Sequence, residues 1–310
     1  FAWQFGSLLM ECTEDCQLGV PVAQTTEEYT FVRGGESLDM ATLQEMYEGK
    51  LDKVFAYRGH SGETTEKFSY AAEKRVAPAV KHVKPLAFIP VFPGTNCEYD
   101  TARAVERAGG AAEILVLNNL TPADITASLE KAREIIARSQ MIVLPGGFSG
   151  GDEPDGSAKF ITAFFRNPVM KDAVSDLLEK RDGLMLGICN GFQALIKLGL
   201  VPFGRIVDTD ENCPTLTFNE IGRHQSMLVR TRIASNKSPW LSRTAVDEVY
   251  TVAISHGEGR FVGPESLIRD LAANGQIATQ YVDIEGNPTM DQRYNPNGSV
   301  LAIEGITSPD

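Results

Sequence analysis

The pattern of hydrophobic and polar positions along the chain changes near Leu86. From there on, short apolar runs alternate with stretches in which apolar residues recur at helical spacing. The runs predict strands at residues 86–92, 112–117, 141–144 and 184–188, and the other stretches predict helices at 97–108, 122–139 and 168–180. A capping box at Thr121 and Asp124 marks the start of the second helix. This alternation predicts an α/β fold, in which a mostly parallel, twisted sheet carries helices on both faces.

The parts of the chain on either side of this region have different patterns. Beyond residue 200, apolar runs predict an antiparallel C-terminal extension with strands at 227–233, 249–254, 277–282 and 300–303. At the start, a Gly34-Gly35 turn and a helical stretch at 38–48 predict a small α+β segment, followed by polar residues typical of a linker. We therefore divide the chain into an N-terminal segment at residues 1–58, a linker at 59–85 and a main domain at 86–310.

The composition narrows the class of protein. The chain has 310 residues, a formal net charge of −12 and a pI near 4.9, which argues against nucleic acid or an anionic membrane as its partner. No apolar run has the length of a membrane span, and no leader peptide is recognisable at Phe1. The five cysteines are scattered, and Cys12-x-x-x-Cys16 lacks the second ligand pair of a zinc site. We expect a cytoplasmic protein without a metal centre.

The most informative stretch is LMLGICNGFQ at residues 184–193. An apolar run there ends in Gly-x-Cys-x-Gly and passes into a helix, which is the pattern of a nucleophile elbow with Cys189 at its tip. Gly187 and Gly191 allow the tight turn, and the positive end of the helix dipole stabilises a thiolate at Cys189. The alternative is a buried structural cysteine beside a turn.

A nucleophilic cysteine needs donors for the oxyanion that forms on the carbonyl under attack. The backbone N–H of Asn190, directly after the nucleophile, is one candidate. Another is an N–H in Gly146-Gly147-Phe148, which follows a predicted strand and so lies, like Cys189, at the carboxyl edge of the sheet. An ordinary strand-ending turn is the alternative interpretation of this glycine pair.

Taken together, these motifs resemble the class I glutamine amidotransferases. The resemblance rests on VLPGGFS at 143–149, on Gly151-Asp152 and on the elbow, where it implies that Gln193 belongs to the substrate site. PGTNCE at 93–98, the CNGFQ form of the elbow and SHGEGRF at 255–261 further resemble the phosphoribosylformylglycinamidine synthase family in its single-chain form. The match covers residues 86–310, and residues 1–58 are similar to the tail of that enzyme's synthase portion.

This resemblance implies a defined reaction. Cys189 attacks the side-chain amide of glutamine to give a thioester and ammonia, and water then releases glutamate. The ammonia passes to a synthase domain of the same polypeptide, where ATP activates the formamide of formylglycinamide ribonucleotide in purine biosynthesis. The glutaminase domain itself is expected to need no cofactor, because ATP and Mg belong to the synthase portion.

The resemblance leaves the general base of this chain open. The family takes its base from a His-x-Glu segment that follows a stretch like residues 305–310, so we expect a C-terminal truncation and low activity of the chain by itself. His256 and Glu258 have the same spacing, but the resemblance assigns them to a motif that lines the site or the ammonia exit. His256 stays an alternative base, and the counter-ion of Arg260 is either Glu258 or a group of a partner domain. We expect His224 at the surface or an interface.

Two other functions remain as alternatives. One is a catalytically silent module that binds glutamine or docks a synthase, and the other is a different Cys-dependent α/β hydrolase. The second leaves the PGTNC and HGEGR motifs unexplained. Cys97 follows a strand but has no elbow, so we expect it to pack in the core rather than to act as a second nucleophile.

Overall fold

The computed structural model describes residues 6–12, 19–51, 54, 59, 61–73, 78, 80–149 and 157–309. The chain divides into two units, residues 1–57 and residues 58–310. Cys16, Gly151 and Asp152, which were singled out in the sequence, lie outside the described residues. No helix in the described part combines the length and the apolar character that a membrane crossing requires.

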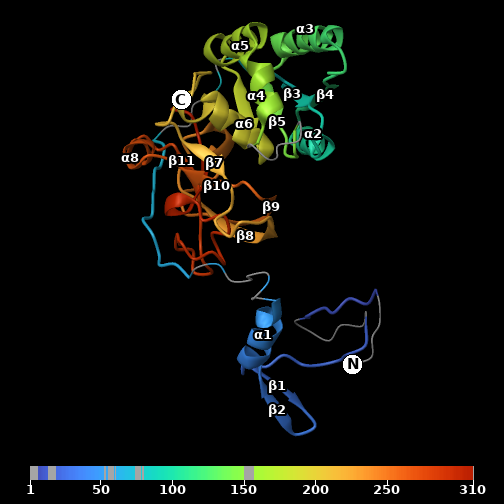
Figure 1. The fold of residues 1–310 in the computed structure, drawn as a ribbon, viewed down its shortest axis with the longest axis vertical. Helices are drawn as coiled ribbons and strands as arrows, with labels where there is room; N and C mark the ends of the chain where they lie inside the picture. Colours follow the sequence, from blue (N-terminus) through green and yellow to red (C-terminus); the bar gives the residue numbers. More distant parts are fainter. Residues whose placement is uncertain are drawn as a thin grey trace. The chain divides into compact units, whose positions relative to one another are not determined.

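The first unit consists of a hairpin followed by a helix (Figure 1). Strands β1 (Thr30–Arg33) and β2 (Glu36–Asp39) pair antiparallel, and α1 (Met40–Glu48) with a short 3₁₀ turn (Gly49–Leu51) follows. The helix predicted at 38–48 begins later than expected, because Asp39 belongs to the hairpin and caps α1 by accepting the Thr42 N–H at 2.8 Å. No described side chain of this unit is fully buried, so its apolar residues have no core of their own.

The second unit contains the predicted parallel sheet. Its strands are β3 (Leu86–Val91), β4 (Ala111–Val116), β5 (Met141–Leu144) and β6 (Leu184–Gly187), in the spatial order β4-β3-β5-β6. Each neighbouring pair is parallel. The carboxyl ends of β3, β5 and β6 therefore meet at one edge of the sheet, and the loops that carry the predicted site residues follow these ends.

Helices cover both faces of this sheet (Figure 1). They are α2 (Glu98–Arg107), α3 (Pro122–Arg138), α4 (Lys159–Arg166), α5 (Pro168–Ser175), α6 (Asn190–Leu198) and α7 (Leu200–Phe203), with a π-helical turn at Asp176–Lys180. Ala102 of α2 packs with Ala87 and Ile89 on one face. Phe88 lies on the other face, in the core formed with α3 to α6. Neighbouring residues of β3 thus face opposite layers, and the predicted α/β fold is confirmed.

The C-terminal extension is antiparallel, as predicted. Strands β8 (Gln225–Ile233), β9 (Val249–His256), β11 (Ile277–Tyr281) and β12 (Ile303–Ile306) form a sheet in the order β12-β11-β8-β9. Beside it lie the pair β7 (Thr215–Thr217) and β10 (Arg260–Val262), helix α8 (Glu265–Ala273), and 3₁₀ turns at Pro239–Leu241 and Val300–Ala302. The strand predicted at 300–303 is wrong, because Leu301 and Ala302 have φ values of 49° and 57° and β12 begins only at Ile303.

Residues 61–73, within the polar stretch that we interpreted as a linker, are bonded to the antiparallel sheet. The side chain of Arg232 on β8 is fully buried and donates to the carbonyl oxygen of Phe68 at 2.6 Å and to Ser69 Oγ at 3.0 Å. Its guanidinium also pairs with Asp247 at 2.8 Å. Polar groups of this segment therefore make hydrogen bonds within the protein. Composition alone does not show whether such groups bond to protein or to water.

Candidate active site

Cys189 lies at a strand-to-helix turn. β6 ends at Gly187 and α6 begins at Asn190, and Cys189 between them has φ 54° and ψ −109°, a conformation that L-residues rarely adopt. A Cβ on Gly187 would lie 2.4 Å from the carbonyl oxygen of Gly191, and a Cβ on Gly191 would lie 2.1 Å from that of Leu144. Because both contacts are with backbone, no larger residue fits without a shift of the main chain. The two glycines therefore allow the tight turn that places the thiol of Cys189 at the edge of the sheet.

The loop after β5, residues 145–149, lies directly beside this elbow, and we call it the glycine loop. A Cβ on Gly146 would lie only 3.3 Å from the Cβ of Cys189. The turn after β3 supports the loop from the other side, because the Asn96 N–H donates to the Gly146 carbonyl oxygen at 3.2 Å. The structure thus brings together two of the segments that the sequence predicted at this edge.

Not every N–H of the glycine loop is available for an oxyanion. The Phe148 N–H donates to the Gly94 carbonyl oxygen at 2.9 Å, so it is already used to hold the loop. The N–H groups of Gly146 and Gly147 have no acceptor among the described residues. Asn190 is the first residue of α6 and directly follows Cys189, so its backbone N–H lies beside the thiol. These three residues are the better candidates for oxyanion donors.

A buried hydrogen-bond relay connects the glycine loop to α6 and to the turn after β9. The Ser149 N–H donates to Asn190 Oδ1 at 3.2 Å, and Asn190 Nδ2 donates to Gln193 Oε1 at 2.9 Å. Gln193 Nε2 then donates to the carbonyl oxygen of Glu258 at 2.7 Å. Both ends of the Gln193 amide are therefore used within the protein, which gives this side chain a supporting position.

The end of β9, the turn after it and the loop before β12 carry buried polar atoms that lack partners among the described residues. Among the described residues, His256 Nδ1, Glu258 Oε1 and Asn297 Oδ1 are buried without a hydrogen-bond partner. The ring of His256 lies against Gly259, where a Cβ would come within 2.6 Å of it. Burial lowers the pKa of His256 below its ordinary value, and the charge of His224 acts in the same direction. The imidazole is therefore neutral at neutral pH.

Arg260 pairs with Glu220 rather than with Glu258, one of the two counter-ions that we considered from the sequence. Its Nη2 lies 3.9 Å from Glu220 Oε1, and its Nε donates to the carbonyl oxygen of Gly298 at 3.2 Å. Arg260 therefore ties β10 to the loop before β12 rather than pairing with Glu258. His224 is exposed, and its Nε2 lies 2.9 Å from Ser255 Oγ.

Two buried residues bonded to each other, Asn297 and Tyr281, were missed in the sequence. Asn297 Nδ2 donates to the phenol oxygen of Tyr281 at 2.9 Å and to the carbonyl oxygen of Gly259 at 2.8 Å. Burial raises the pKa of Tyr281 well above its usual value, and the charges of Glu304 and Cys189 act in the same direction. The turn motif NPNG at 295–298 was the only sequence signal, and we interpreted it merely as a turn before a strand.

Cys97 does not pack in the core, which corrects our expectation. It is exposed, because the turn after β3 places it at the edge of the sheet as the residue that precedes α2. Its Sγ lies 3.7 Å from the position of a Cβ on Gly146, and the Sγ of Cys189 lies 3.8 Å from the same point. Both thiols therefore lie close to Gly146.

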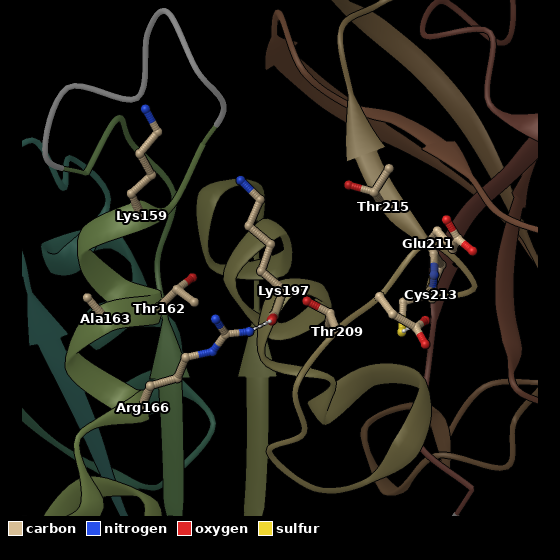
Figure 2. Close-up of a pocket in the computed structure, with 11 residues that line it drawn as sticks. Lys159, Thr162, Ala163, Arg166, Lys197, Thr209, Glu211, Cys213 and Thr215 are labelled. Carbon is tan, nitrogen blue, oxygen red and sulfur yellow. Dashed lines mark hydrogen bonds between the residues drawn. The ribbon is translucent and has the colours of Figure 1, made fainter.

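A cavity of about 740 Å³ opens at the far end of α6 (Figure 2). Lys159 and Arg166 of α4 and Lys197 of α6 line one wall, and Glu211 belongs to the opposite wall. Asp210 also lines the cavity. Arg166 Nη2 donates to the carbonyl oxygen of Lys197 at 3.0 Å. Since no lining residue belongs to the elbow or the glycine loop, this cavity is separate from the site at Cys189.

Metal ligands do not gather near the elbow. Within the described ranges, no group of His, Cys, Asp and Glu side chains has the arrangement that a metal ion requires. Cys12 is an exposed, free cysteine. Its partner in the Cys-x-x-x-Cys spacing, Cys16, lies outside the described residues.

Comparison with known proteins identifies the class of protein to which this fold and site belong. A model of CobB/CobQ-like glutamine amidotransferase domains matches residues 84–310, so the chain belongs to this family. A curated relative, the phosphoribosylformylglycinamidine synthase subunit PurQ of Methanococcus maripaludis, is 36% identical over 217 residues, which is 69% of this chain and 73% of the relative. The subunit PurQ of Chlorobium chlorochromatii is 32% identical over 222 residues, which is 71% of this chain and 80% of the relative.

Solved structures agree with this assignment. The structure of PurLQS from Thermotoga maritima matches with a TM-score of 0.50 and 25% identity, over 71% of this chain and 80% of that chain. The family resemblance that the motifs indicated is therefore confirmed, and so is the class I glutamine amidotransferase-like fold.

Proposed function

We propose that this chain is the glutamine-hydrolysing part of a phosphoribosylformylglycinamidine synthase. Cys189 attacks the side-chain amide of glutamine, a glutamyl thioester forms and ammonia leaves, and water then releases glutamate and the thiol. The observation that carries the proposal is the approach of Gly146 to Cys189, where a Cβ on the glycine would lie 3.3 Å from that of the cysteine. The PurQ relatives support this choice of reaction.

The oxyanion of the tetrahedral intermediate is stabilised by backbone donors. In this proposal they are the Asn190 N–H and an N–H of Gly146 or Gly147, which flank the thiol from two loops. Each such donor is worth about 3–4 kcal/mol of transition-state stabilisation. Gln193 acts indirectly, because its amide is bonded to Asn190 and to the Glu258 carbonyl group.

His256 has a supporting role rather than that of the base. Its ring lies against Gly259, and its buried Nδ1 has no partner among the described residues. The resemblance gives the role of base to a separate His-x-Glu pair. Glu258, whose buried Oε1 also has no partner among the described residues, accepts the last hydrogen bond of the relay with its carbonyl oxygen.

The ammonia is consumed by a synthase domain of the same polypeptide, where it amidates formylglycinamide ribonucleotide. The first unit supports this assignment, because Leu8, Leu9 and Tyr47 are 88%, 84% and 85% exposed in it. Apolar side chains of that size are expected to pack on a larger body, and the tail of the synthase portion would do so. ATP and Mg act in the synthase portion, and the glutaminase unit uses glutamine alone.

A glutamine analogue with an electrophilic carbon in place of the amide tests this proposal. We expect one adduct per chain by intact-mass analysis, located on Cys189 by peptide mapping. Cys189→Ala removes the adduct, whereas Cys213→Ala, which changes a half-buried thiol at the separate cavity, retains it. An adduct that persists in Cys189→Ala would disprove the assignment of the nucleophile.

A further inference from the structure

The site contains a second thiol that the proposed reaction does not use. Cys97 and Cys189 belong to different loops, and neither is in a disulfide. Their sulfur atoms lie 3.7 Å and 3.8 Å from one point, the position that a Cβ on Gly146 would occupy. Because residue 146 is glycine, no side chain of its own fills this point, to which both sulfur atoms are close.

We propose that Cys97 is the resolving thiol of Cys189, so that a peroxide converts the pair into a disulfide that closes the glutamine site reversibly. The inference rests on the proposed function in taking Cys189 as a nucleophilic thiol. Redox-sensitive cysteines are accessible thiolates with a second thiol close by. Cys97 is exposed and Cys189 is half-buried, so both can be reached from solvent.

The chemistry needs hydrogen peroxide and no other reagent. The Cys189 thiolate attacks one oxygen of the peroxide, so that an S–O bond forms, the O–O bond breaks and hydroxide leaves. The Cys97 thiolate then attacks the Cys189 sulfur, so that the S–S bond forms, the S–O bond breaks and a second hydroxide leaves. Two thiols are oxidised, and one peroxide is reduced to two molecules of water once the protons are counted.

Within the second unit, the position of the remaining cysteine makes Cys97 the favoured partner. Cys213 lines the separate cavity, where its Sγ lies 3.5 Å from Asp210 Oδ1. Bond formation requires the two sulfurs to approach to about 2.05 Å, which calls for side-chain rotation and a small movement of the turn before α2.

Peptide mapping under non-reducing conditions tests the proposal. The protein is treated with a small excess of hydrogen peroxide, remaining thiols are alkylated, and the chain is digested with trypsin. We expect a cross-link between the peptides at 82–103 and 182–197, with a mass two hydrogens below the sum of the two peptides and reversal by dithiothreitol. Oxidation of Cys189 without this cross-link, or a cross-link to Cys213 instead, would overturn the proposal.

Variants separate a resolving role from mere proximity. In Cys97→Ser the resolving thiol is removed and Cys189 proceeds to the sulfinic acid, so we expect about tenfold less thiol at Cys189 after peroxide followed by dithiothreitol than in the wild type. Cys213→Ser is the control and should recover like the wild type. Equal recovery in Cys97→Ser and the wild type would contradict the proposal. The readouts use no glutamine, so a cross-link without any reaction with the glutamine analogue would count against the proposed function alone.

Discussion

Asn190 and Gln193 are joined by a buried hydrogen bond, in which Asn190 Nδ2 donates to Gln193 Oε1 at 2.9 Å. The bond is the middle step of the relay that runs from the Ser149 N–H to the carbonyl oxygen of Glu258. Both residues lie on α6, which begins directly after Cys189. The helix that presents Cys189 therefore also fixes the glycine loop on one side and the turn after β9 on the other.

Replacing Asn190 by alanine should weaken both the fold and the site. The Ser149 N–H and the Gln193 amide oxygen would stay buried without partners, which costs about 1–3 kcal/mol in the free energy of unfolding. A displaced glycine loop should also slow the reaction of Cys189 with the glutamine analogue by about tenfold. Urea unfolding and the rate of adduct formation measure the two effects. Asn119→Ala, which changes an exposed residue after β4, is the control and should leave both unchanged.

Alanine at Gly191 should be far more harmful than alanine at an open glycine. The new Cβ would lie 2.1 Å from the Leu144 carbonyl oxygen, so the elbow or β5 must move. We expect a loss of about 3 kcal/mol in the free energy of unfolding, together with loss of the adduct on Cys189. Gly19→Ala is the matched control, because nothing lies within 4 Å of its Cβ position. Equal stability of Gly191→Ala and Gly19→Ala would show that the turn is not as tight as described.

Arg232 should contribute strongly to the attachment of residues 61–73. In Arg232→Met the Phe68 carbonyl oxygen and Gln280 Oε1 lose donors that lie at 2.6 Å and 2.7 Å. We expect the free energy of unfolding to fall by about 3 kcal/mol and amide exchange in residues 61–73 to become faster. Arg243→Met changes an exposed arginine and serves as the control. Unchanged exchange in this segment would mean that other contacts hold it.

His256 should make the stability of the protein depend on pH in the acidic range. Because burial lowers its pKa below 6.5, the unfolded chain binds the proton at a higher pH than the folded chain. Stability should therefore fall as the pH decreases from 6.5 towards the folded-state pKa, and this contribution should be constant above 6.5. His256→Asn removes the group, so urea unfolding across this range should show a smaller slope than in the wild type. Identical slopes in the variant and the wild type would contradict the burial of His256.

Local sequence signals predicted the parallel layer well. Thr121 accepts the Asp124 N–H at 3.2 Å and donates its own N–H to the Asp124 carboxylate at 2.9 Å, which is the capping box that the sequence indicated. The strands of this layer begin and end within one residue of the predicted bounds. Such features depend on neighbours in the sequence, so propensity and spacing are enough to locate them.

Features set by distant contacts were not predictable. Helices α4 and α8 were missed, and the strand before residue 303 was misplaced because Leu301 takes a positive φ that apolar character does not reveal. The exposure of Cys97 follows from its place at the edge of the sheet, and the burial of Arg232 follows from acceptors in a segment more than 160 residues earlier, such as Phe68. Spacing along the chain carries no information about such pairs.

Protection by the substrate tests the central claim most directly. The rate at which the electrophilic glutamine analogue modifies Cys189 is measured by intact mass with increasing free glutamine, and with asparagine at the same concentrations. If Cys189 is the nucleophile of a glutamine site, glutamine slows the modification in a saturable manner and asparagine, one methylene shorter, protects far less. A rate that glutamine leaves unchanged, or that asparagine lowers equally, would contradict the account.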